Sequence, residues 1–365
     1  MKEKLASRRV SRQISVGGKL IGGGAPVSVQ SMTNTDPLDL NATRAQVLAL
    51  SNAGCDIVRL ALPTLRSVET VKALKAEGIS VPLVADIHFD YKIALAAVEA
   101  GIDKIRINPG NIGDGDRVRA VADACRAAGV PIRIGVNSGS LEKSILEKYG
   151  SPTPEALAES ALYHAELLEA CAFKDIAISV KASSVPDMIV ANRILAKATD
   201  YPLHLGVTEA GGVAQGTTKS AIGIGTLLSE GIGDTVRVSL TADPVLEVKA
   251  ARNILSALDL LEDKGMDIIS CPTCGRTKID LIPLLEAFEN EVDRLFLRSL
   301  PIKVAFMGCI VHGPGEAREA DIGVAGGLGE GIIFRHGIPG ERVKSDEIVP
   351  TLIAEILKMK DRKNG

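Results

Sequence analysis

Short runs of β-branched residues alternate along the first two thirds of the chain with longer, Ala-rich amphipathic stretches. This rhythm predicts a parallel sheet covered by helices. Eight runs are predicted as strands: residues 27–32, 56–62, 81–88, 103–109, 131–137, 175–183, 202–208 and 234–240. Eight parallel strands favour closure, so we expect an α/β fold of the (β/α)8 TIM barrel type. A doubly wound open sheet is the alternative.

The stretches between these runs carry the signals that begin and end helices. Helices are predicted at residues 43–53, 68–77, 93–100 and 116–128, each followed by a glycine suited to the C′ position. The eighth helix follows Asp243-Pro244, where Asp can cap and Pro can occupy the first position. Ahead of the first barrel strand, Gly17-Gly18 separates two short apolar runs and predicts a hairpin at about residues 12–22.

The pattern changes near Gly265, where the eighth helix ends. A strand at IISC is followed by a helix from about Lys278, a strand at KVAFMGC, two Gly-rich hairpin-like segments and a last helix. We therefore expect a barrel domain over residues 1–265 and a small α/β domain over residues 266–365. The chain of 365 residues fits this division, because a barrel takes about 250 residues.

Composition and charge narrow the classes of function. Hydrophobic residues make up 46% and charged residues 24% of the chain, as in globular proteins with a large core. A formal charge of −3 and 3% aromatic residues argue against a nucleic-acid partner. The basic N-terminus has no continuous apolar segment, and no apolar run is long enough to span a bilayer. We expect a cytoplasmic protein.

The six cysteines form two groups. Cys271 and Cys274 have the C-x-x-C spacing that lets two thiolates at the start of a helix reach one metal centre, and Cys309 supplies a third from another strand end. Clustered cysteines without a secretory signal indicate a reducing compartment. The remaining cysteines occur singly and are predicted to be buried in the core: Cys55, Cys125 and Cys171.

Three thiolates leave one ligand position of a closed site open, and His312 and Glu316 are the candidates for it. A structural, non-catalytic Cys3His zinc site and an iron–sulfur cluster fit the cysteine spacing about equally. Pro272 and the turn HGPG shape tight backbone whose N–H groups can hydrogen-bond cluster sulfides, which favours the cluster. A weak oxygen ligand at the fourth position is what a catalytic metal requires.

The residues that close the predicted barrel strands are polar and mostly cationic, and barrel active sites lie at these strand ends. Five strands contribute a cation: Arg59, Arg106, Arg133, Lys181 and Arg237. Their mutual repulsion costs several kcal/mol unless an anion lies among them, and the guanidinium fork matches phosphate, so diphosphate fits best. The alternative is a set of structural ion pairs. His88 is ambiguous, and His204 is predicted to be a satisfied core histidine.

A cluster with an open position and a cationic pocket together suggest reductive removal of an oxygen from a phosphorylated compound. Two other functions compete with this hypothesis. A pterin- or corrinoid-dependent methyl transferase would leave the clustered cysteines unexplained. A zinc-stapled binding protein for phosphate would not need so cationic a mouth.

Nine segments between about residues 9 and 341 resemble the family of bacterial 4-hydroxy-3-methylbut-2-en-1-yl diphosphate synthases: VQSMTNTDP, VRLALP, VADIHFD, RINPGN, RIGVNSGS, SVKAS, HLGVTEAGG, CPTCGR and MGCIVHGPGEA. The resemblance implies a TIM barrel followed by a domain that holds a [4Fe-4S] cluster. It implies reductive ring opening and dehydration of 2-C-methyl-D-erythritol 2,4-cyclodiphosphate, with flavodoxin or ferredoxin as electron donor. It also implies a head-to-tail homodimer.

The resemblance further implies a role for each candidate residue. Cys271, Cys274 and Cys309 would hold three irons, and Glu316 the fourth until substrate displaces it. Glu209 would donate a proton near the departing hydroxyl. The remaining barrel residues would bind or orient the substrate, the five cations with Ser239 holding its diphosphate: Arg59, Asp86, Arg106, Asn108, Arg133, Asn137, Lys181, Ser183, Arg237 and Ser239. His312 stands where this family usually has Asn, and we expect it to donate a hydrogen bond to the substrate.

Overall fold

The computed structural model of the chain describes residues 5–261, 265–309 and 317–364. Its internal contacts divide the chain into two compact units, Met1–Leu261 and Glu262–Gly365. Within the described part, no helix is both long enough and apolar enough to cross a membrane.

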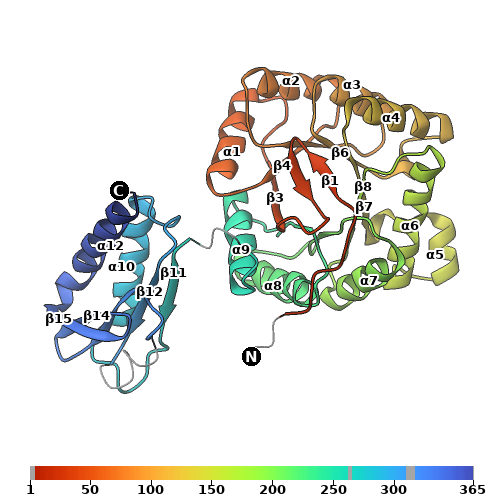
Figure 1. The fold of residues 1–365 in the computed structure, drawn as a ribbon. Coiled ribbons are helices and arrows are strands. Elements are labelled where there is room, and N and C mark those ends of the chain that lie inside the picture. Colours follow the sequence, from red (N-terminus) through yellow and green to blue (C-terminus); the bar gives the residue numbers. More distant parts are fainter. Residues whose placement is uncertain (1–4, 262–264, 310–316, 365) are drawn as a thin grey trace. The chain divides into compact units, whose positions relative to one another are not determined.

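The first unit is a barrel of eight parallel strands, which confirms the predicted fold class (Figure 1). The strands follow one another in the order β8-β7-β6-β5-β4-β3-β10-β9, and a parallel bridge between Ile178 and Leu203 brings β8 beside the segment that leads into β9. Their bounds are β3 (Ser28–Met32), β4 (Ile57–Ala61), β5 (Leu83–Asp86), β6 (Lys104–Ile107), β7 (Ile132–Asn137), β8 (Ile176–Lys181), β9 (His204–Leu205) and β10 (Thr235–Val236).

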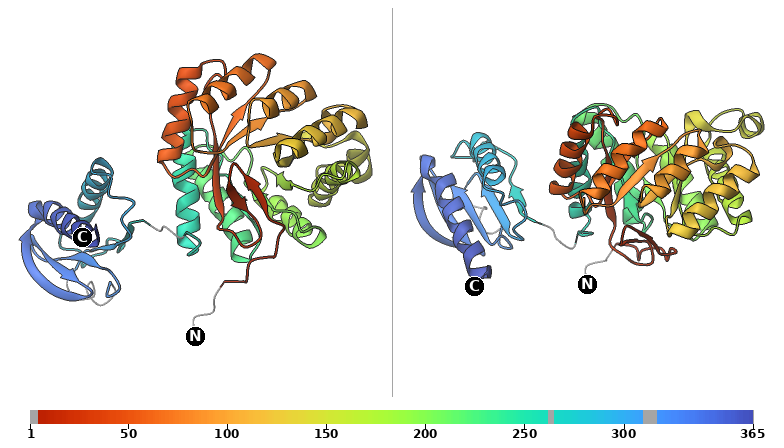
Figure 2. Two further views of the ribbon diagram at one scale, coloured as in Figure 1. Left: turned by 45° about the horizontal axis from the view of Figure 1, so that its top comes forward. Right: turned by 90° about the horizontal axis from the view of Figure 1, so that it is seen from above.

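Helices surround the strands, as the views in Figures 1 and 2 show. They are α1 (Leu40–Asn52), α2 (Val68–Ala76), α3 (Tyr91–Glu99), α4 (Gly115–Ala128), α5 (Lys143–Tyr149), α6 (Pro154–Ala170), α7 (Val185–Ala198), α8 (Val213–Ser229) and α9 (Pro244–Ala257). The predicted start of α9 is confirmed: the Asp243 carboxylate accepts a hydrogen bond from the N–H of Val245, and Pro244 is the first helical residue. The short helix α5, between β7 and β8, was not predicted.

Strand alternation decides which side chains enter the barrel. In β6, Ile105 and Ile107 belong to the apolar core beneath the helices, whereas the alternate residues Lys104 and Arg106 lie among the charged side chains of the interior. Because side chains alternate between the two faces of a strand, the sequence KIRIN directs its apolar residues outward and its polar residues inward. The barrel interior is therefore polar.

The predicted N-terminal hairpin is present as β1 (Ile14–Val16) and β2 (Lys19–Ile21), with Gly17 and Gly18 at positive φ in the turn. Its Ile14, Val16 and Ile21 form an apolar cluster with residues near the beginnings of three barrel strands: Ile57, Val84 and Ala177. The hairpin thus covers the N-terminal end of the barrel.

The second unit is one five-stranded sheet in the order β11-β12-β13-β14-β15, parallel from β11 to β13 and antiparallel beyond. Its elements are β11 (Asp267–Ser270), α10 (Leu281–Arg294), β12 (Lys303–Met307), β13 (Ile322–Gly326), β14 (Glu330–Arg335), β15 (Ile338–Lys344) and α12 (Ile348–Asn364). Phe288 of α10 packs against Phe306 of β12, with ring centroids 4.9 Å apart. Strand β15 was missed because its sequence, IPGERVK, is mostly exposed and polar.

Candidate functional site

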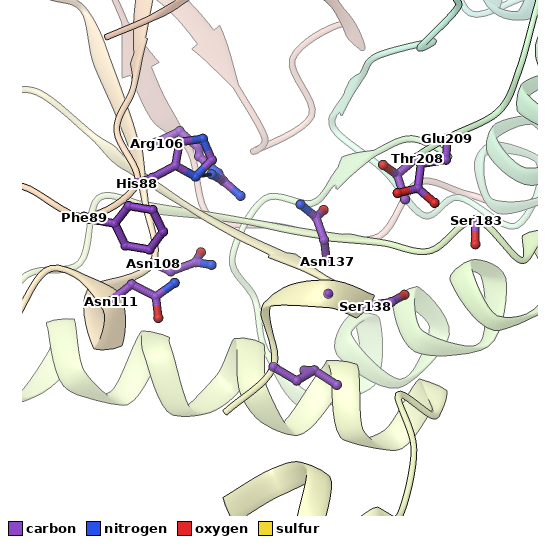
Figure 3. A pocket seen from close by; sticks show the side chains of 12 residues that line it. His88, Phe89, Arg106, Asn108, Asn111, Asn137, Ser138, Ser183, Thr208 and Glu209 are labelled. Carbon is purple, nitrogen blue, oxygen red and sulfur yellow. Dashed lines mark hydrogen bonds between the residues drawn. The ribbon is translucent and has the colours of Figure 1, made fainter. Parts of the chain in front are cut away.

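Two adjoining cavities lie at the C-terminal end of the barrel, one of about 220 Å³ and one of about 760 Å³. Both are lined by His88, Arg106, Asn137 and Thr208. Together they bring in every barrel residue predicted for the site: Arg59, Asp86, Arg106, Asn108, Arg133, Asn137, Lys181, Ser183, Glu209, Arg237 and Ser239. Figure 3 shows the larger cavity, with His88 and Arg106 on one flank and Thr208, Glu209 and Ser183 on the other.

Asp86 supplies a carboxylate to the wall of the smaller cavity. Its oxygens lie 3.7 Å from Arg59 Nη2, 3.3 Å from Arg106 Nη1 and 3.6 Å from His88 Nε2. Burial alone would raise the pKa of Asp86, but the surrounding cations outweigh burial and hold it well below its usual value. Burial lowers the pKa of Arg59 to about 10, although Asp86 opposes the shift. Asp86 therefore stays ionised and orients two guanidinium groups.

A second carboxylate, Glu247 in the first turn of α9, was missed by the sequence analysis. It is 4% exposed, and its oxygens lie 3.3 Å from Nε and Nη2 of Arg237. It also accepts hydrogen bonds from Ser31 Oγ and from the N–H of Leu240. The structural ion-pair alternative thus holds in part for Arg237, whose guanidinium is fixed in place by the helix.

Arg133 and Lys181 are different, because none of the described carboxylates forms an ion pair with either side chain. Arg133 is 1% exposed, and its Nε and Nη1 have no hydrogen-bond partner in the described structure. Burial and, next, the charge of Arg59 hold the pKa of Arg133 well below its usual value. The cavity wall therefore carries positive charge that the described side chains leave uncompensated, and a multiply charged anion would compensate it.

Two glycines, which the sequence analysis also missed, make room for the cations. Arg106 Nη2 donates to the carbonyl oxygen of Gly135 at 2.6 Å, and a Cβ at Gly135 would lie 2.2 Å from Arg106 Nε. A Cβ at Gly206 would lie 2.7 Å from Lys181 Nζ and 2.6 Å from the carbonyl oxygen of Arg237. A side chain at Gly135 or Gly206 would therefore force the neighbouring cation to move.

Gly206→Ala is expected to weaken the binding of inorganic diphosphate by about tenfold, because the new methyl group displaces the Lys181 amine and forfeits one charge-assisted contact. Isothermal titration calorimetry measures this change. The control is Gly225→Ala in α8, where nothing lies within 4 Å of the added Cβ. It should leave binding unchanged and stabilise the helix by up to ~1 kcal/mol. Equal binding by Gly206→Ala and the wild type would contradict the expectation.

Glu209 stands out by its backbone. Its φ is +51°, in the left-handed region that residues other than glycine seldom adopt, and its side chain lines the larger cavity (Figure 3). Strain of this kind persists where surrounding structure holds it, often at functional sites. This backbone conformation places the carboxyl group of Glu209 beside Thr208 at the cavity wall.

The two histidines left open by the sequence have different surroundings. His88 has a 60% exposed side chain at the mouth, and its Nδ1 lies 3.3 Å from Arg106 Nη1. His204 is fully buried, as predicted, and its Nδ1 lies 3.3 Å from Thr235 Oγ1. Its Nε2, however, has no partner in the described structure, so the prediction of a satisfied histidine is only half right. Burial holds the pKa of His204 well below its usual value, so the ring is neutral.

In the second unit, two of the three clustered cysteines leave neighbouring parallel strands. Cys271 follows β11 and Cys309 follows β12, and Ser270 of β11 pairs with Phe306 of β12. The N–H of Gly308 donates to Cys271 Sγ at 3.1 Å. Cys274 is exposed, and its pKa is lowered chiefly by a backbone hydrogen bond from Arg276. Cys271 and Cys274 lie in a loop rather than at the start of a helix, since α10 begins at Leu281, so that prediction was wrong.

The three thiols suit an iron–sulfur cluster in ligand type, partial exposure and an N–H donor to sulfur, but this structure does not bring Cys271, Cys274 and Cys309 together as a ligand set. Among the described residues, no three His, Cys, Asp or Glu side chains are grouped closely enough to hold a metal. His312 and Glu316 lie outside the described residues, so the candidate fourth ligands have no described position.

Comparison with known proteins gives the same two-part division. Residues 11–252 match a family model described as the GcpE TIM-barrel domain, and residues 267–358 match the GcpE protein C-terminal domain. A protein of Clostridium perfringens is 55% identical over 347 residues, 95% of this chain and 98% of its own. One of Caldanaerobacter subterraneus is 54% identical over 352 residues, 96% and 98% of the two chains. Both are named 4-hydroxy-3-methylbut-2-en-1-yl diphosphate synthase (flavodoxin).

Among solved structures, the type I 3-dehydroquinate dehydratase of Clostridium difficile is similar with a TM-score of 0.50 and 15% identity. The match covers 68% of this chain and 98% of that enzyme. At this identity the likeness shows the barrel fold alone.

Proposed function

The chain belongs to the GcpE family, and from this membership we propose how its residues carry out the family's reaction. That reaction converts 2-C-methyl-D-erythritol 2,4-cyclodiphosphate to 4-hydroxy-3-methylbut-2-enyl diphosphate. It consumes electrons and protons and releases water, and the relatives' names give flavodoxin as the electron donor. Neither the methyl transferase nor the zinc-stapled alternative agrees with these names.

The observation that carries the proposal is a pair of buried basic side chains, Arg133 and Lys181, that form no ion pair with a described carboxylate. Removing such charges from water costs several kcal/mol each unless an opposite charge approaches. The substrate's diphosphate brings that charge. Further hydrogen-bond donors to the diphosphate come from Arg59, Arg106 and Arg237. Asp86 and Glu247 hold these three guanidinium groups in place.

The cysteine set is proposed to hold a [4Fe-4S] cluster through Cys271, Cys274 and Cys309, with Glu316 as the exchangeable fourth ligand. When bound, the cluster supplies electrons and a Lewis-acidic iron. The barrel residues bind the diphosphate and fix the ring's orientation, and Asn108, Asn137, Ser183 and Ser239 supply polar groups at the cavity wall. His312 is proposed to hydrogen-bond the substrate.

Glu209 is proposed to donate the proton to the departing hydroxyl. Glu209→Gln keeps the shape of the side chain but removes the acid, so kcat is expected to fall by about 10² to 10⁴ with little change in KM. Steady-state kinetics with a chemical reductant measures the effect. Glu209→Gly is the companion variant: glycine accepts the positive φ without strain, so it should raise Tm while lowering kcat as far. Full activity in either variant would remove Glu209 from the mechanism.

Substrate binding is expected to take up protons. Burial and, next, the charges of Arg237, Arg59 and Arg133 hold the pKa of Lys181 well below its usual value. Because a bound diphosphate favours the ammonium form, affinity should fall as pH rises above the lowered pKa.

Calorimetric titrations in buffers of different ionisation enthalpy count the protons taken up, and Lys181→Met should lower that count. Lys181 affects the stability of the empty protein in the opposite direction, because a higher pH favours the folded state. The unfolded chain binds the lysine proton more readily, so this group makes the free energy of unfolding rise with pH from the lowered pKa to about 10.4.

The direct test of the proposed function is turnover of the cyclodiphosphate by anaerobically purified protein with a low-potential reductant. Loss of substrate and appearance of the linear diphosphate, followed by mass spectrometry, support the proposal. A colourless protein that contains zinc and leaves the substrate intact would refute it.

Three further parts of the proposal concern the protein's setting. Flavodoxin is the donor named for the relatives, and ferredoxin is the alternative donor. A head-to-tail homodimer, implied by the family resemblance, is testable by sedimentation. A reducing cytoplasm is the proposed compartment, in keeping with six cysteines that form no disulfide in the structure.

A further inference from the structure

A buried histidine outside the cavities joins two of the loops that line them. His164 lies on α6 and its side chain is 0% exposed. The N–H of Gly110 donates to His164 Nδ1 at 3.1 Å, and His164 Nε2 lies 2.7 Å from Glu142 Oε1. Neither residue was singled out by the sequence analysis, because nothing in their spacing indicates that they meet.

The contacts fix the protonation of the ring. A backbone N–H can only donate, so Nδ1 must be the unprotonated acceptor. The proton of the neutral imidazole is then on Nε2, facing the carboxylate of Glu142. The Nε2 and Oε1 atoms lie 2.7 Å apart, close enough for a charge-assisted contact, but the carboxylate is not aligned to accept a regular hydrogen bond.

The partners of His164 belong to two different loops of the site. Gly110 lies in the 3-10 turn Pro109–Asn111 that follows β6, between the cavity-lining residues Asn108 and Asn111. Glu142 directly precedes the first residue of α5 and directly follows Leu141, which also lines the larger cavity. A Cβ at Gly110 would lie 2.8 Å from His164 Cε1, so the loop approaches the ring as closely as glycine allows.

We propose that His164 and Glu142 are positioning residues for the substrate, which hold the loops after β6 and β7 in the conformation that presents Asn108, Asn111 and Leu141 to the cavity. This inference rests on the proposed function for its kinetic test but not for its structural one. Neither residue touches the cavity itself, so both act through the loops that they anchor.

The charged groups around the His164 ring predict that its contact with the loop after β6 depends on pH. Glu142 favours the protonated ring, whereas burial and Arg106 oppose it, and Tyr163 lies beside it with ring centroids 5.7 Å apart. Burial is the largest effect and lowers the pKa of His164 below its usual value. A proton gained at low pH would occupy Nδ1 and break the hydrogen bond from Gly110. The loop after β6 should therefore loosen as pH falls below about 6.5.

Two isosteric variants separate the two contacts. In His164→Asn the side-chain oxygen can take the place of Nδ1 and still accept from Gly110, but it does not reach Glu142. In His164→Gln the amide reaches the position of Nε2 and the acceptor for Gly110 is lost. We expect His164→Gln to raise KM about tenfold with kcat within about twofold, and His164→Asn to keep KM near that of the wild type.

Amide hydrogen exchange over residues 108–112 supplies a readout that needs no substrate. Relative to the intrinsic exchange rate at each pH, exchange should quicken in His164→Gln and in the wild type at low pH, and stay slow in His164→Asn. The inference would be overturned if neither variant changed exchange or KM. It would also be overturned if both variants lost protection and substrate affinity equally, in proportion to their fall in Tm. If the wild type itself does not turn over the cyclodiphosphate, the proposed function fails, and the exchange measurement still decides the role of His164.

Discussion

Arg133→Met is expected to remove substrate binding while making the empty protein more stable. Arg133 is 1% exposed, its Nε and Nη1 have no hydrogen-bond partner among the described residues, and other cations are its main charged neighbours. An apolar side chain of similar length removes an uncompensated buried charge, and such replacements stabilise by up to ~4 kcal/mol. The same change removes a proposed buried partner of the diphosphate, which should weaken binding at least about a hundredfold.

Calorimetric titration with the cyclodiphosphate and unfolding in urea measure the two effects. The matched control is Arg119→Met, which replaces an exposed arginine on α4 and should change neither quantity. A loss of stability in Arg133→Met with substrate affinity intact would mean that Arg133 has a structural role, and the phosphate site would have to be placed elsewhere.

Cys309→Ser is expected to lower turnover by at least about three orders of magnitude, because the chemistry of the proposed iron–sulfur cluster has no substitute among the side chains. Iron and sulfide content should fall in parallel. Titration with the cyclodiphosphate should still show binding to the barrel residues, which separates loss of the cluster from loss of the fold.

Cys171→Ser provides the control, since Cys171 is a half-buried free thiol at the end of α6 in the barrel unit. It should retain both metal and activity. A Cys309→Ser protein with wild-type iron and sulfide would remove Cys309 from the ligand set.

The architecture was predictable because each local pattern specifies its own element. Gly17-Gly18 permits the positive φ values of a tight turn, and Asp243-Pro244 begins a helix whatever it packs against. The five cations were predictable for a related reason. In parallel strands the carboxyl ends meet at one end of the barrel, so residues far apart in sequence were expected to gather there.

The supporting residues were not predictable, because their roles exist only after folding. Glu247 has the sequence context of an ordinary residue in a first helical turn, and its pairing with Arg237 depends on how α9 packs against the barrel. Gly206 stands in a strand run, and only the Arg237 carbonyl oxygen and the Lys181 amine beside it in the folded barrel explain the absent side chain. The strain at Glu209 likewise leaves no sequence signal, although the following Gly211 also has positive φ.

The cation-lined cavity of the barrel is proposed to bind the diphosphate of the substrate. Titration of 2-C-methyl-D-erythritol 2,4-cyclodiphosphate into the wild type and into Lys181→Met decides whether it does. Saturable binding by the wild type that weakens with added salt, and at least about a hundredfold weaker binding by Lys181→Met, is the predicted result. Equal affinity in the two proteins, or no binding by the wild type, would contradict the claim.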